Sequence, residues 1–322
     1  MSWSLFFLGT SSACPTKYRN VSSYGVRFDD GKVILVDCGE GTQHQFAKYN
    51  DNPLNNAVPL KFANIHTILI THLHGDHLYG LPGLLASMSM AGRDTPLSVR
   101  GPIGLKEYID TTFRLSGLHT MYEINIVELN PNTQTFFTTN SMNICSYPLQ
   151  HKIPSVGYLL AEPDKPGKFN TEKANKLGVV DKRHYGMLSQ GKSVLLEDGR
   201  TINSCDVTDG TRLGRKLLLL GDTCDSSSAI AESVGADFVV HEATFEASME
   251  QMAIAKGHST SKMAGKFAKS ICAKNLILTH FSARYSTNED PVQKLVSEAA
   301  IECPETKVFA ANDLEHYMIP KN

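Results

Sequence analysis

The sequence has no long apolar run. No stretch of about 20 residues is apolar enough to span a bilayer, and the apolar start at 1–9 is short and lacks the basic flank of a signal peptide. We therefore expect neither a membrane anchor nor a secretion signal. These absences predict an intracellular protein, in the cytoplasm or, as the alternative, in the nucleus.

Regularly spaced cysteine pairs are also missing. The seven cysteines are odd in number and scattered, and none belongs to a Cys-x-x-Cys pair. This pattern argues against a disulfide framework and against a thiolate metal site. We interpret all of them as ordinary reduced thiols.

The chain lacks a strong charge of either sign. Its formal net charge is -2 at pH 7. A protein with this balance does not attract a polyanion over its whole surface. Any nucleic-acid partner must therefore bind a local basic patch.

Histidine and aspartate gather in one short segment, 71–77, which reads Thr-His-Leu-His-Gly-Asp-His. The β-branched run 67–71 leads into it and predicts a buried strand, so four candidate ligands lie at a strand end and in the loop after it: His72, His74, Asp76 and His77. Imidazoles and a carboxylate without thiolate suit zinc, with manganese or iron as alternatives. An isolated histidine is usually an ordinary core residue, but four such groups without a metal would need other buried partners.

The pattern His-x-His-x-Asp-His resembles the metallo-β-lactamase superfamily. There the remaining ligands come from later strand ends, in the order histidine, bridging aspartate, histidine. Three residues match, because each follows a strand-like run: His151 after 143–148, Asp222 after 216–220 and His280 after 275–279. The resemblance implies two Zn²⁺ ions per subunit, one held by His72, His74 and His151, the other by Asp76, His77 and His280, with Asp222 bridging both. A position left for water on each ion is typical of a catalytic site.

Strand and helix patterns alternate along the chain. Strands are expected at 4–8, 24–28, 32–37, 67–71, 97–100, 124–129, 143–148, 156–161, 216–220, 237–241, 275–279 and 306–309, and helices at 40–50, 78–91, 103–115, 226–234, 260–273 and 290–301. Periodicity alone indicates an α/β protein. The resemblance implies more, namely a metallo-β-lactamase αβ/βα four-layer sandwich formed by residues 1–322 as a single domain.

Further motifs resemble those of the ribonuclease Z family, which processes the 3′ end of tRNA. They are Pro-x-x-x-Arg-Asn at 15–20, His-Glu-Ala-Thr at 241–244, His-Ser-Thr at 258–260 and His-Phe-Ser-x-Arg-Tyr at 280–285. Taken alone, the first would be an ordinary solvated loop, rich in turn formers. The resemblance implies that it approaches the acceptor end of the tRNA, so we expect substrate contacts from Lys17, Arg19, Asn20, Arg284 and Tyr285.

The resemblance implies a zinc-dependent endoribonuclease that removes the 3′ trailer from precursor tRNA. A metal-activated hydroxide would attack the phosphodiester, leaving a tRNA 3′-hydroxyl and a 5′-phosphorylated trailer. We expect Asp76 to act as base as well as ligand, and His258, oriented by Glu242, to protonate the leaving oxygen. The alternative for His258 is a supporting or helix-capping role. Asp37 is expected to brace the ligand loop.

The segment 162–215 differs from the rest of the chain. It opens with proline and glycine turns, and between 165 and 183 it carries six cations and two acids. Such a charge run is usually a solvated surface, but here the ribonuclease Z family inserts a flexible arm that grips tRNA away from the active site. We therefore expect phosphate contacts from Lys165, Lys168, Lys173, Lys176, Lys182 and Arg183. Because Lys182 and Arg183 stand where the family arm has Gly-Pro, we expect binding to depend on phosphate electrostatics more than on a rigid backbone contact.

Two other functions fit parts of the pattern. Another dinuclear hydrolase of this fold, such as a small phosphodiesterase or an arylsulfatase-like enzyme, would share the ligands but leave the arm and the 15–20 loop without a shared purpose. A non-catalytic RNA-binding subunit should have lost ligands, and none is missing. The expected partner is precursor tRNA, and the resemblance also implies a homodimer in which one subunit's arm holds tRNA for the other subunit's metals.

Overall fold

The computed structural model describes residues 3–52, 58–139, 142–286 and 291–321. By its internal contacts the chain divides into two units. The larger comprises Met1–Phe137, Ile144–Leu160 and Lys216–Lys321, and the smaller consists mainly of Ala161–Arg215. The smaller unit thus begins within one residue of the segment that composition sets apart and ends with it.

The first sheet of the larger unit contains seven strands in the order β18-β1-β2-β3-β4-β5-β6. Their bounds are β1 Trp3–Gly9, β2 Ser23–Arg27, β3 Val33–Val36, β4 Ile65–Leu69, β5 Leu97–Pro102, β6 Ile124–Leu129 and β18 His316–Ile319. Pairing is antiparallel from β18 through β1 and β2 to β3, and parallel from β3 through β4 and β5 to β6. The carboxyl ends of β3 and β4 therefore lie at the same edge of the sheet.

The second sheet also contains seven strands, in the order β17-β16-β15-β14-β9-β8-β7. Their bounds are β7 Thr135–Thr139, β8 Met142–Leu149, β9 Ser155–Ala161, β14 Lys216–Leu219, β15 Phe238–Glu242, β16 Asn275–Thr279 and β17 Lys307–Ala310. The run from β14 to β17 is parallel. The loops after β14, β15 and β16 consequently start from one edge.

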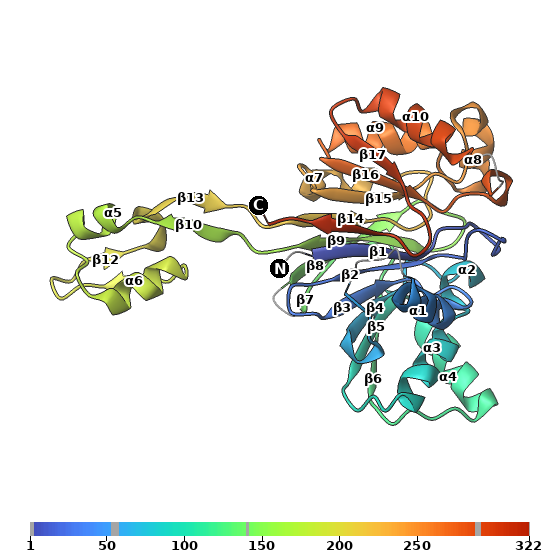
Figure 1. Ribbon diagram of the computed structural model, residues 1–322, viewed down its shortest axis with the longest axis horizontal. Coiled ribbons are helices and arrows are strands. Elements are labelled where there is room, and N and C mark those ends of the chain that lie inside the picture. The colour runs from blue at the N-terminus through green and yellow to red at the C-terminus, as the bar shows by residue number, and fades with distance from the viewer. Residues whose placement is uncertain (1–2, 53–57, 140–141, 287–290, 322) are drawn as a thin grey trace. The chain divides into compact units, whose positions relative to one another are not determined.

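The two sheets stack against each other, with helices on their outer faces (Figure 1). Tyr24 donates its hydroxyl to the Leu220 carbonyl at 3.3 Å, and Tyr158 donates to the Ile70 carbonyl at 2.7 Å, so both buried tyrosines tie one sheet to the other. The helices of the larger unit are α1 Thr42–Asp51, α2 Gly75–Leu78, α3 Leu81–Met90, α4 Leu105–Ser116, α7 Ile230–Ser233, α8 Glu250–Lys256, α9 Ser261–Ser270 and α10 Val292–Glu302. Helices α1, α3 and α4 pack on the first sheet, and α9 and α10 on the second. The predicted αβ/βα sandwich is confirmed.

Helix boundaries agree with the sequence patterns in some places and differ in others. The helix expected at 78–91 is observed as α3, which begins only at Leu81, and the short α2 ends at Leu78. Between them, a Cβ on Gly80 would lie 2.0 Å from the Gly39 carbonyl oxygen. Helix α9 begins as predicted, because the Thr260 hydroxyl accepts from the Met263 amide at 3.2 Å. Helix α8 was not predicted.

The smaller unit has a core of its own. Strand β10 (Lys165–Phe169) pairs antiparallel with β13 (Thr208–Arg212), and β11 (Val194–Leu195) with β12 (Thr201–Ile202). Helices α5 (Thr171–Lys176) and α6 (Lys182–Ser189) share a small apolar core with these segments: Ala174, Val179, Leu188, Val194, Ile202 and Val207. The charged helix expected near 171–178 is α5, whereas α6 and the four strands were missed. In neither unit does a described helix have the length and apolar character needed to cross a membrane.

Candidate metal centre

The seven predicted ligands meet where strands of both sheets end. The segment from His72 to His77 follows β4, and the other three follow β8, β14 and β16. Their ligand atoms form close groups, each within 4.8 Å: His72, His74 and His151 with Asp222, and Asp76 and His77 with His280. The structure therefore brings together side chains that are more than 200 residues apart in sequence.

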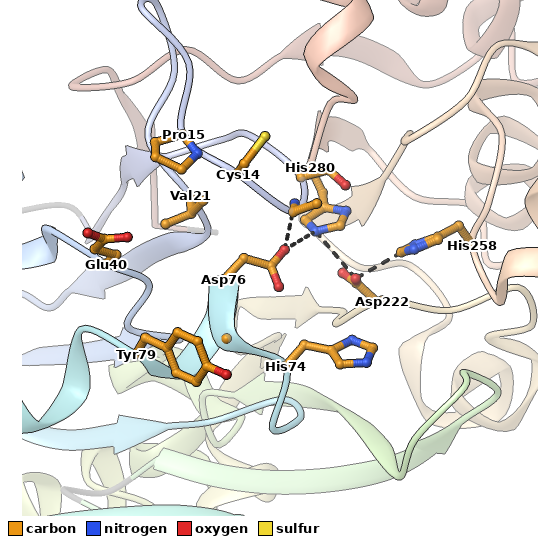
Figure 2. A pocket seen from close by; sticks show the side chains of 13 residues that line it. Cys14, Pro15, Val21, Glu40, His74, Asp76, Tyr79, Asp222, His258 and His280 are labelled. Atoms are coloured by element: carbon orange, nitrogen blue, oxygen red, sulfur yellow. Dashed lines mark hydrogen bonds and ion pairs between the residues drawn. The ribbon is translucent and has the colours of Figure 1, made fainter.

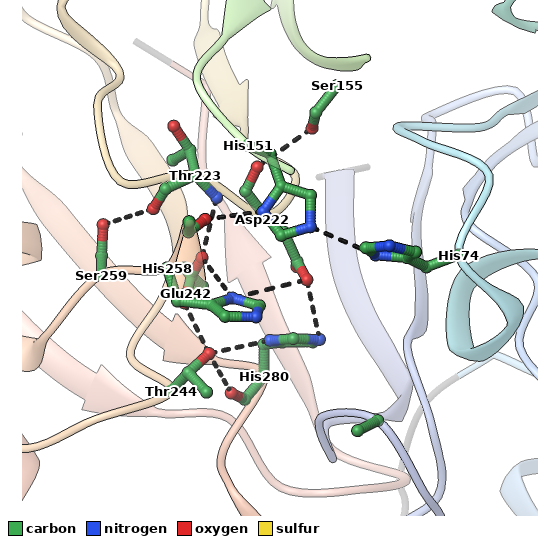
Figure 3. A network of polar contacts seen from close by, with 12 residues as sticks. His74, His151, Ser155, Asp222, Thr223, Glu242, Thr244, His258, Ser259 and His280 are labelled. Atoms are coloured by element: carbon green, nitrogen blue, oxygen red, sulfur yellow. Dashed lines mark hydrogen bonds and ion pairs between the residues drawn. The ribbon is translucent and has the colours of Figure 1, made fainter. Parts of the chain in front are cut away.

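Nitrogen atoms of the first group face one another. His72 Nε2 lies 3.1 Å from His74 Nδ1, and His151 Nε2 lies 3.2 Å from the same atom. Asp222 Oδ2 is 3.7 Å from His72 Nε2. Figure 3 shows His74 and His151 turned toward each other with Asp222 beside them.

The second group has the same compactness. His77 Nε2 and His280 Nε2 are 3.1 Å apart, and Asp76 Oδ2 lies 3.3 Å from His280 Nε2. Asp222 reaches this group too, with 3.4 Å to His77 Nε2 and 3.3 Å to His280 Nε2. One carboxylate is thus in contact with both groups.

The donor set fits a metal cation. The outer nitrogen of His77 donates to Asp37 Oδ2 at 2.7 Å, and that of His151 donates to the Gly257 carbonyl at 2.6 Å. Once such a ring is neutral, the nitrogen that faces the cluster is a lone pair, and lone pairs this close repel one another unless a proton or a metal cation lies between them. The Asp37 contact also confirms the prediction that this residue braces the ligand loop.

The two carboxylates of the cluster are charged. Burial alone would raise the pKa of Asp222, but the imidazoles of His280, His77 and His72 lower it well below its ordinary value. Burial likewise acts to raise the pKa of Asp76, and the hydrogen bond from His280 and the nearby His77 outweigh it and lower the pKa. Ionised carboxylates are the form that binds metal.

His258 lies beside this cluster and contacts Glu242. Its Nδ1 is 3.1 Å from Glu242 Oε1 and 3.6 Å from Asp222 Oδ2. Burial lowers the pKa of His258, but the charge and hydrogen bond of Glu242, together with Asp222, raise it to about 9. His258 also forms a group with Asp222 and His280 whose possible ligand atoms lie within 4.8 Å of one another, but an imidazole ring protonated on both nitrogens has no lone pair to offer a metal.

A cavity of about 550 Å³ opens over the cluster and is lined by His74, Asp76, Asp222, His258 and His280, among others (Figure 2). The loop after β1 forms one wall, where the Ala13 amide donates to Asp76 Oδ2 at 2.7 Å. Tyr79 lines the cavity with 66% of its surface exposed. Sequence reasoning missed Tyr79, although its place two residues after the ligand segment was a usable signal.

Backbone strain concentrates at this site. Among the described residues outside glycine, five have positive φ, and three of them border the cluster: Ala13 at 64°, Asp37 at 58° and His280 at 58°. Such conformations are costly and persist where surrounding contacts enforce them. Here each of these residues contacts a ligand or is one.

The residues expected to contact substrate divide into two kinds. Lys17 and Arg284 are exposed. Arg19 is buried, and its guanidinium donates to Thr10 Oγ1, the Ala311 carbonyl and Asn312 Oδ1 at 2.6 to 2.8 Å.

The remaining two also have protein partners. Asn20 Nδ2 donates to the Glu40 carbonyl at 2.9 Å. Tyr285 is buried, and its hydroxyl accepts from the Glu246 amide at 2.9 Å. Arg19, Asn20 and Tyr285 therefore use these polar groups to hold loops, where the sequence predicted substrate contacts.

The arm cations lie in the smaller unit. Three form ion pairs: Lys165 with Glu162 at 2.7 Å, Lys173 with Asp209 at 2.9 Å and Arg183 with Asp181 at 2.8 Å. For Lys168, Lys176 and Lys182, no described acidic group forms an ion pair within 4.0 Å.

The sandwich and its cluster of histidines and aspartates define a metal-binding protein of the metallo-β-lactamase fold. The solved structure of the short form of human tRNase Z is similar over 98% of this chain and 99% of that chain, with a TM-score of 0.69 and 29% identity. A family model described as Anti-Pycsar protein Apyc1 matches residues 3–151. That match includes the ligands up to His151 and ends before Asp222 and His280.

Curated relatives are similar over nearly the whole chain. Ribonuclease Z of Acaryochloris marina is 39% identical over 317 residues, which are 98% of this chain and 97% of the relative. Ribonuclease BN of Cronobacter sakazakii is 39% identical over 312 residues, 96% of each chain. The chain belongs to the ribonuclease Z family.

Proposed function

We propose that this protein is a zinc-dependent endoribonuclease that removes the 3′ trailer from precursor tRNA. Hydrolysis of one phosphodiester leaves a 3′-hydroxyl on the tRNA and a 5′-phosphate on the trailer. The observation that carries the proposal is the group of seven ligands under one cavity, beside the His258–Glu242 pair, in a ribonuclease Z chain. The name of the human neighbour, tRNase Z, supports tRNA as the substrate.

We assign one ion to His72, His74 and His151, a second to Asp76, His77 and His280, and Asp222 to both. Zinc suits these imidazole and carboxylate donors, with manganese or iron as alternatives. Two ions held there supply, when bound, a nucleophile at neutral pH and charge neutralisation at the scissile phosphate. The short contacts from Asp222 to both groups support its bridging role.

We assign the proton transfers to Asp76 and His258, with Glu242 as the partner that orients His258. Asp76 is held by the Ala13 amide at the cavity wall and is our candidate base. The leaving 3′-oxygen needs a proton, and His258 carries one at neutral pH because Glu242 and Asp222 raise its pKa to about 9 despite burial, which acts to lower it. Since Nδ1 of His258 donates to Glu242, Nε2 is the nitrogen left to donate to substrate.

We assign the basic groups of both units to RNA phosphates. The set comprises Lys17 and Arg284 near the centre and Lys165, Lys168, Lys173, Lys176, Lys182 and Arg183 in the arm, while Arg19, Asn20 and Tyr285 act by holding loops. Phosphate contacts suit an enzyme that must accept many tRNA sequences, because they position RNA without reading bases.

We further propose a homodimer in which one subunit's arm holds the tRNA that enters the other subunit's cavity. Mixing an Asp222→Ala subunit with an arm-deleted subunit tests it. Restored cleavage in the mixed dimer is expected, and no rescue despite confirmed subunit exchange would place the action within one chain.

Incubation of the purified protein with end-labelled precursor tRNA tests the main proposal. One endonucleolytic cut at the trailer junction is expected, with a 3′-hydroxyl and a 5′-phosphate at the product ends. The seven ligands alone would equally serve another dinuclear hydrolase of this fold, such as a small phosphodiesterase, which is therefore the second candidate. Rapid hydrolysis of a small phosphodiester with intact precursor tRNA would select that candidate.

A further inference from the structure

Two threonines each lie between a different buried carboxylate and a different histidine of the metal centre. Thr71 Oγ1 lies 2.9 Å from Asp37 Oδ2 and 3.0 Å from His72 Nδ1. Thr71 is fully buried, so no solvent competes for these contacts.

The second threonine repeats the arrangement at the end of β15. Thr244 Oγ1 contacts Glu242 Oε2 and lies 2.9 Å from His280 Nδ1 (Figure 3). It also lies 3.0 Å from the His280 carbonyl, which is likewise only an acceptor. Thr244 is 3% exposed.

The direction of each hydrogen bond follows from the proton count. A hydroxyl has one proton, and an ionised carboxylate or a carbonyl can only accept it. The threonine oxygen must therefore accept from the imidazole, which places the ring proton of His72 and of His280 on Nδ1. Their Nε2 atoms are then lone pairs, and these are the atoms that face the other ligands, at 3.1 Å from His74 Nδ1 and from His77 Nε2 respectively.

We propose that Thr71 and Thr244 are positioning residues, each of which fixes the tautomer of one ligand histidine. The threonine hydroxyl donates its proton to a buried carboxylate, and its oxygen accepts the Nδ1 proton of the histidine. We call each chain of carboxylate, threonine and histidine a relay. This inference rests on the proposed function's assignment of His72 and His280 to different ions. Each carboxylate also holds a second ring directly, since Asp37 accepts from His77 and Glu242 from His258. Glu242 thus joins the proposed proton donor to a ligand of the second ion.

Zinc affinity of four variants tests the proposal. Thr71→Val and Thr244→Val remove the hydroxyl with little change in shape, and Thr71→Ser and Thr244→Ser keep it as matched controls. Competition with a chelator should show one of the two ions bound about 10–100-fold more weakly in each valine variant, the usual cost of losing an outer hydrogen-bond partner of a ligand. The serine variants should bind both ions nearly as the parent does.

The relay through Thr71 and the relay through Thr244 can be told apart by testing each valine variant in a protein that already lacks one ligand histidine. In a His280→Ala protein, Thr244→Val should add little further loss, whereas Thr71→Val should still weaken the other ion, because interacting residues are not additive. In the zinc-loaded protein with ¹⁵N-labelled histidine, the Nδ1–H signal of His280 should persist in Thr244→Ser and change in Thr244→Val. Equal unfolding temperatures of the metal-free proteins ensure that the comparison is between folded chains.

Parental affinity for both ions in Thr244→Val would overturn the proposal, and so would a serine variant as weak as its valine counterpart. These measurements need no RNA. If the affinities follow the expected pattern while precursor tRNA stays uncut, the relay stands and the proposed function fails.

Discussion

In the larger unit the charged groups of the metal centre are buried or half-buried and each contacts a specific partner, whereas the six arm cations between 165 and 183 lie at the surface. Asp222 contacts imidazoles on both sides of the cluster, and the His77 ring is held between that cluster and Asp37. Lys182, by contrast, lies at the start of helix α6 with no described acidic group paired to it. Neighbouring side chains therefore hold the charged groups of the metal centre in place, whereas no ion pair within the described residues holds Lys182.

This difference separates two tasks of one enzyme. Chemistry at a phosphodiester needs groups held to within a fraction of an ångström, which buried networks provide. Contact with RNA phosphates needs charge near a flexible polyanion, which surface lysines provide. We therefore expect the larger unit to control the rate of cleavage and the smaller unit to control affinity and its dependence on salt.

The largest effect is expected from Asp222→Ala. Loss of this carboxylate leaves the facing histidines without the group that contacts both sets, so metal content and cleavage should fall together to background. Metal analysis with single-turnover cleavage measures both. Asp225 is an exposed carboxylate nearby, so Asp225→Ala is the control and should behave as the parent. Full metal content in Asp222→Ala would remove the bridging assignment.

The next largest effect on cleavage is expected from His258→Ala. An acid acts mainly in the transition state, so single-turnover cleavage should fall by roughly 10²–10⁴-fold while metal content and precursor affinity stay nearly unchanged. Rate and binding are measured on the same preparation. Cleavage at the parental rate would make His258 a supporting residue, the alternative left open by the sequence.

A smaller effect is expected from Lys182→Ala combined with Arg183→Ala. Precursor tRNA binding at moderate salt should weaken, and the slope of affinity against salt should fall by roughly 0.7–0.9 for each phosphate that is no longer neutralised. Lys182→Ala alone should account for more of this than Arg183→Ala, because Arg183 is paired with Asp181. Lys269→Ala in α9 is the exposed control.

A small phosphodiester provides the matching readout for the arm. Hydrolysis of bis(p-nitrophenyl) phosphate should be spared in the double variant, since that substrate reaches the centre without the arm. Equal loss on both substrates would mean that the pair supports the fold or the centre.

The smallest effect concerns pH and Asp313, near the start of the first loop. Burial raises the pKa of Asp313 to about 6, although the Asn20 amide, Thr10 and Arg19 act to lower it. The folded state therefore binds a proton that the unfolded state releases near its ordinary pKa of 3.8. The stability from this proton is fully present below pH 3.8 and is lost as pH rises through about 6.

Asp313→Asn removes this titration. The free energy of unfolding of the parent relative to the variant should therefore drop as pH rises from below about 4 to above about 6, by an amount on the order of 1–3 kcal/mol. Denaturant unfolding of the two metal-free proteins across that range measures the difference. A difference that stays constant with pH would assign Asp313 an ordinary pKa.

The sequence predicted which seven side chains meet in one cluster, because the first four stand in one local motif and the family resemblance gave the order of the other three. Each ligand follows an apolar run, and a strand end is where a loop side chain meets its counterparts. Arg19 shows where such reasoning stops, since its partners Ala311 and Asn312 lie 292 and 293 residues away. A cationic side chain in a loop has the same sequence signature whether it faces substrate or is buried.

Other misses share that cause. The break between α2 and α3 depends on the approach of Gly39 to Gly80, and the roles of Thr71 and Thr244 depend on which oxygen lies beside each hydroxyl. The apolar residues of the smaller unit are few and widely spaced, so they gave no periodic signal for β10 to β13. Composition marked that segment as different but did not indicate that it has its own core.

Anomalous diffraction from crystals of the zinc-loaded protein, recorded at the zinc edge, tests the central claim most directly. We predict two peaks per chain, one contacted by His72, His74 and His151, the other by Asp76, His77 and His280, with Asp222 in contact with both. A single peak at saturating zinc, or two peaks that Asp222 does not touch, would contradict it.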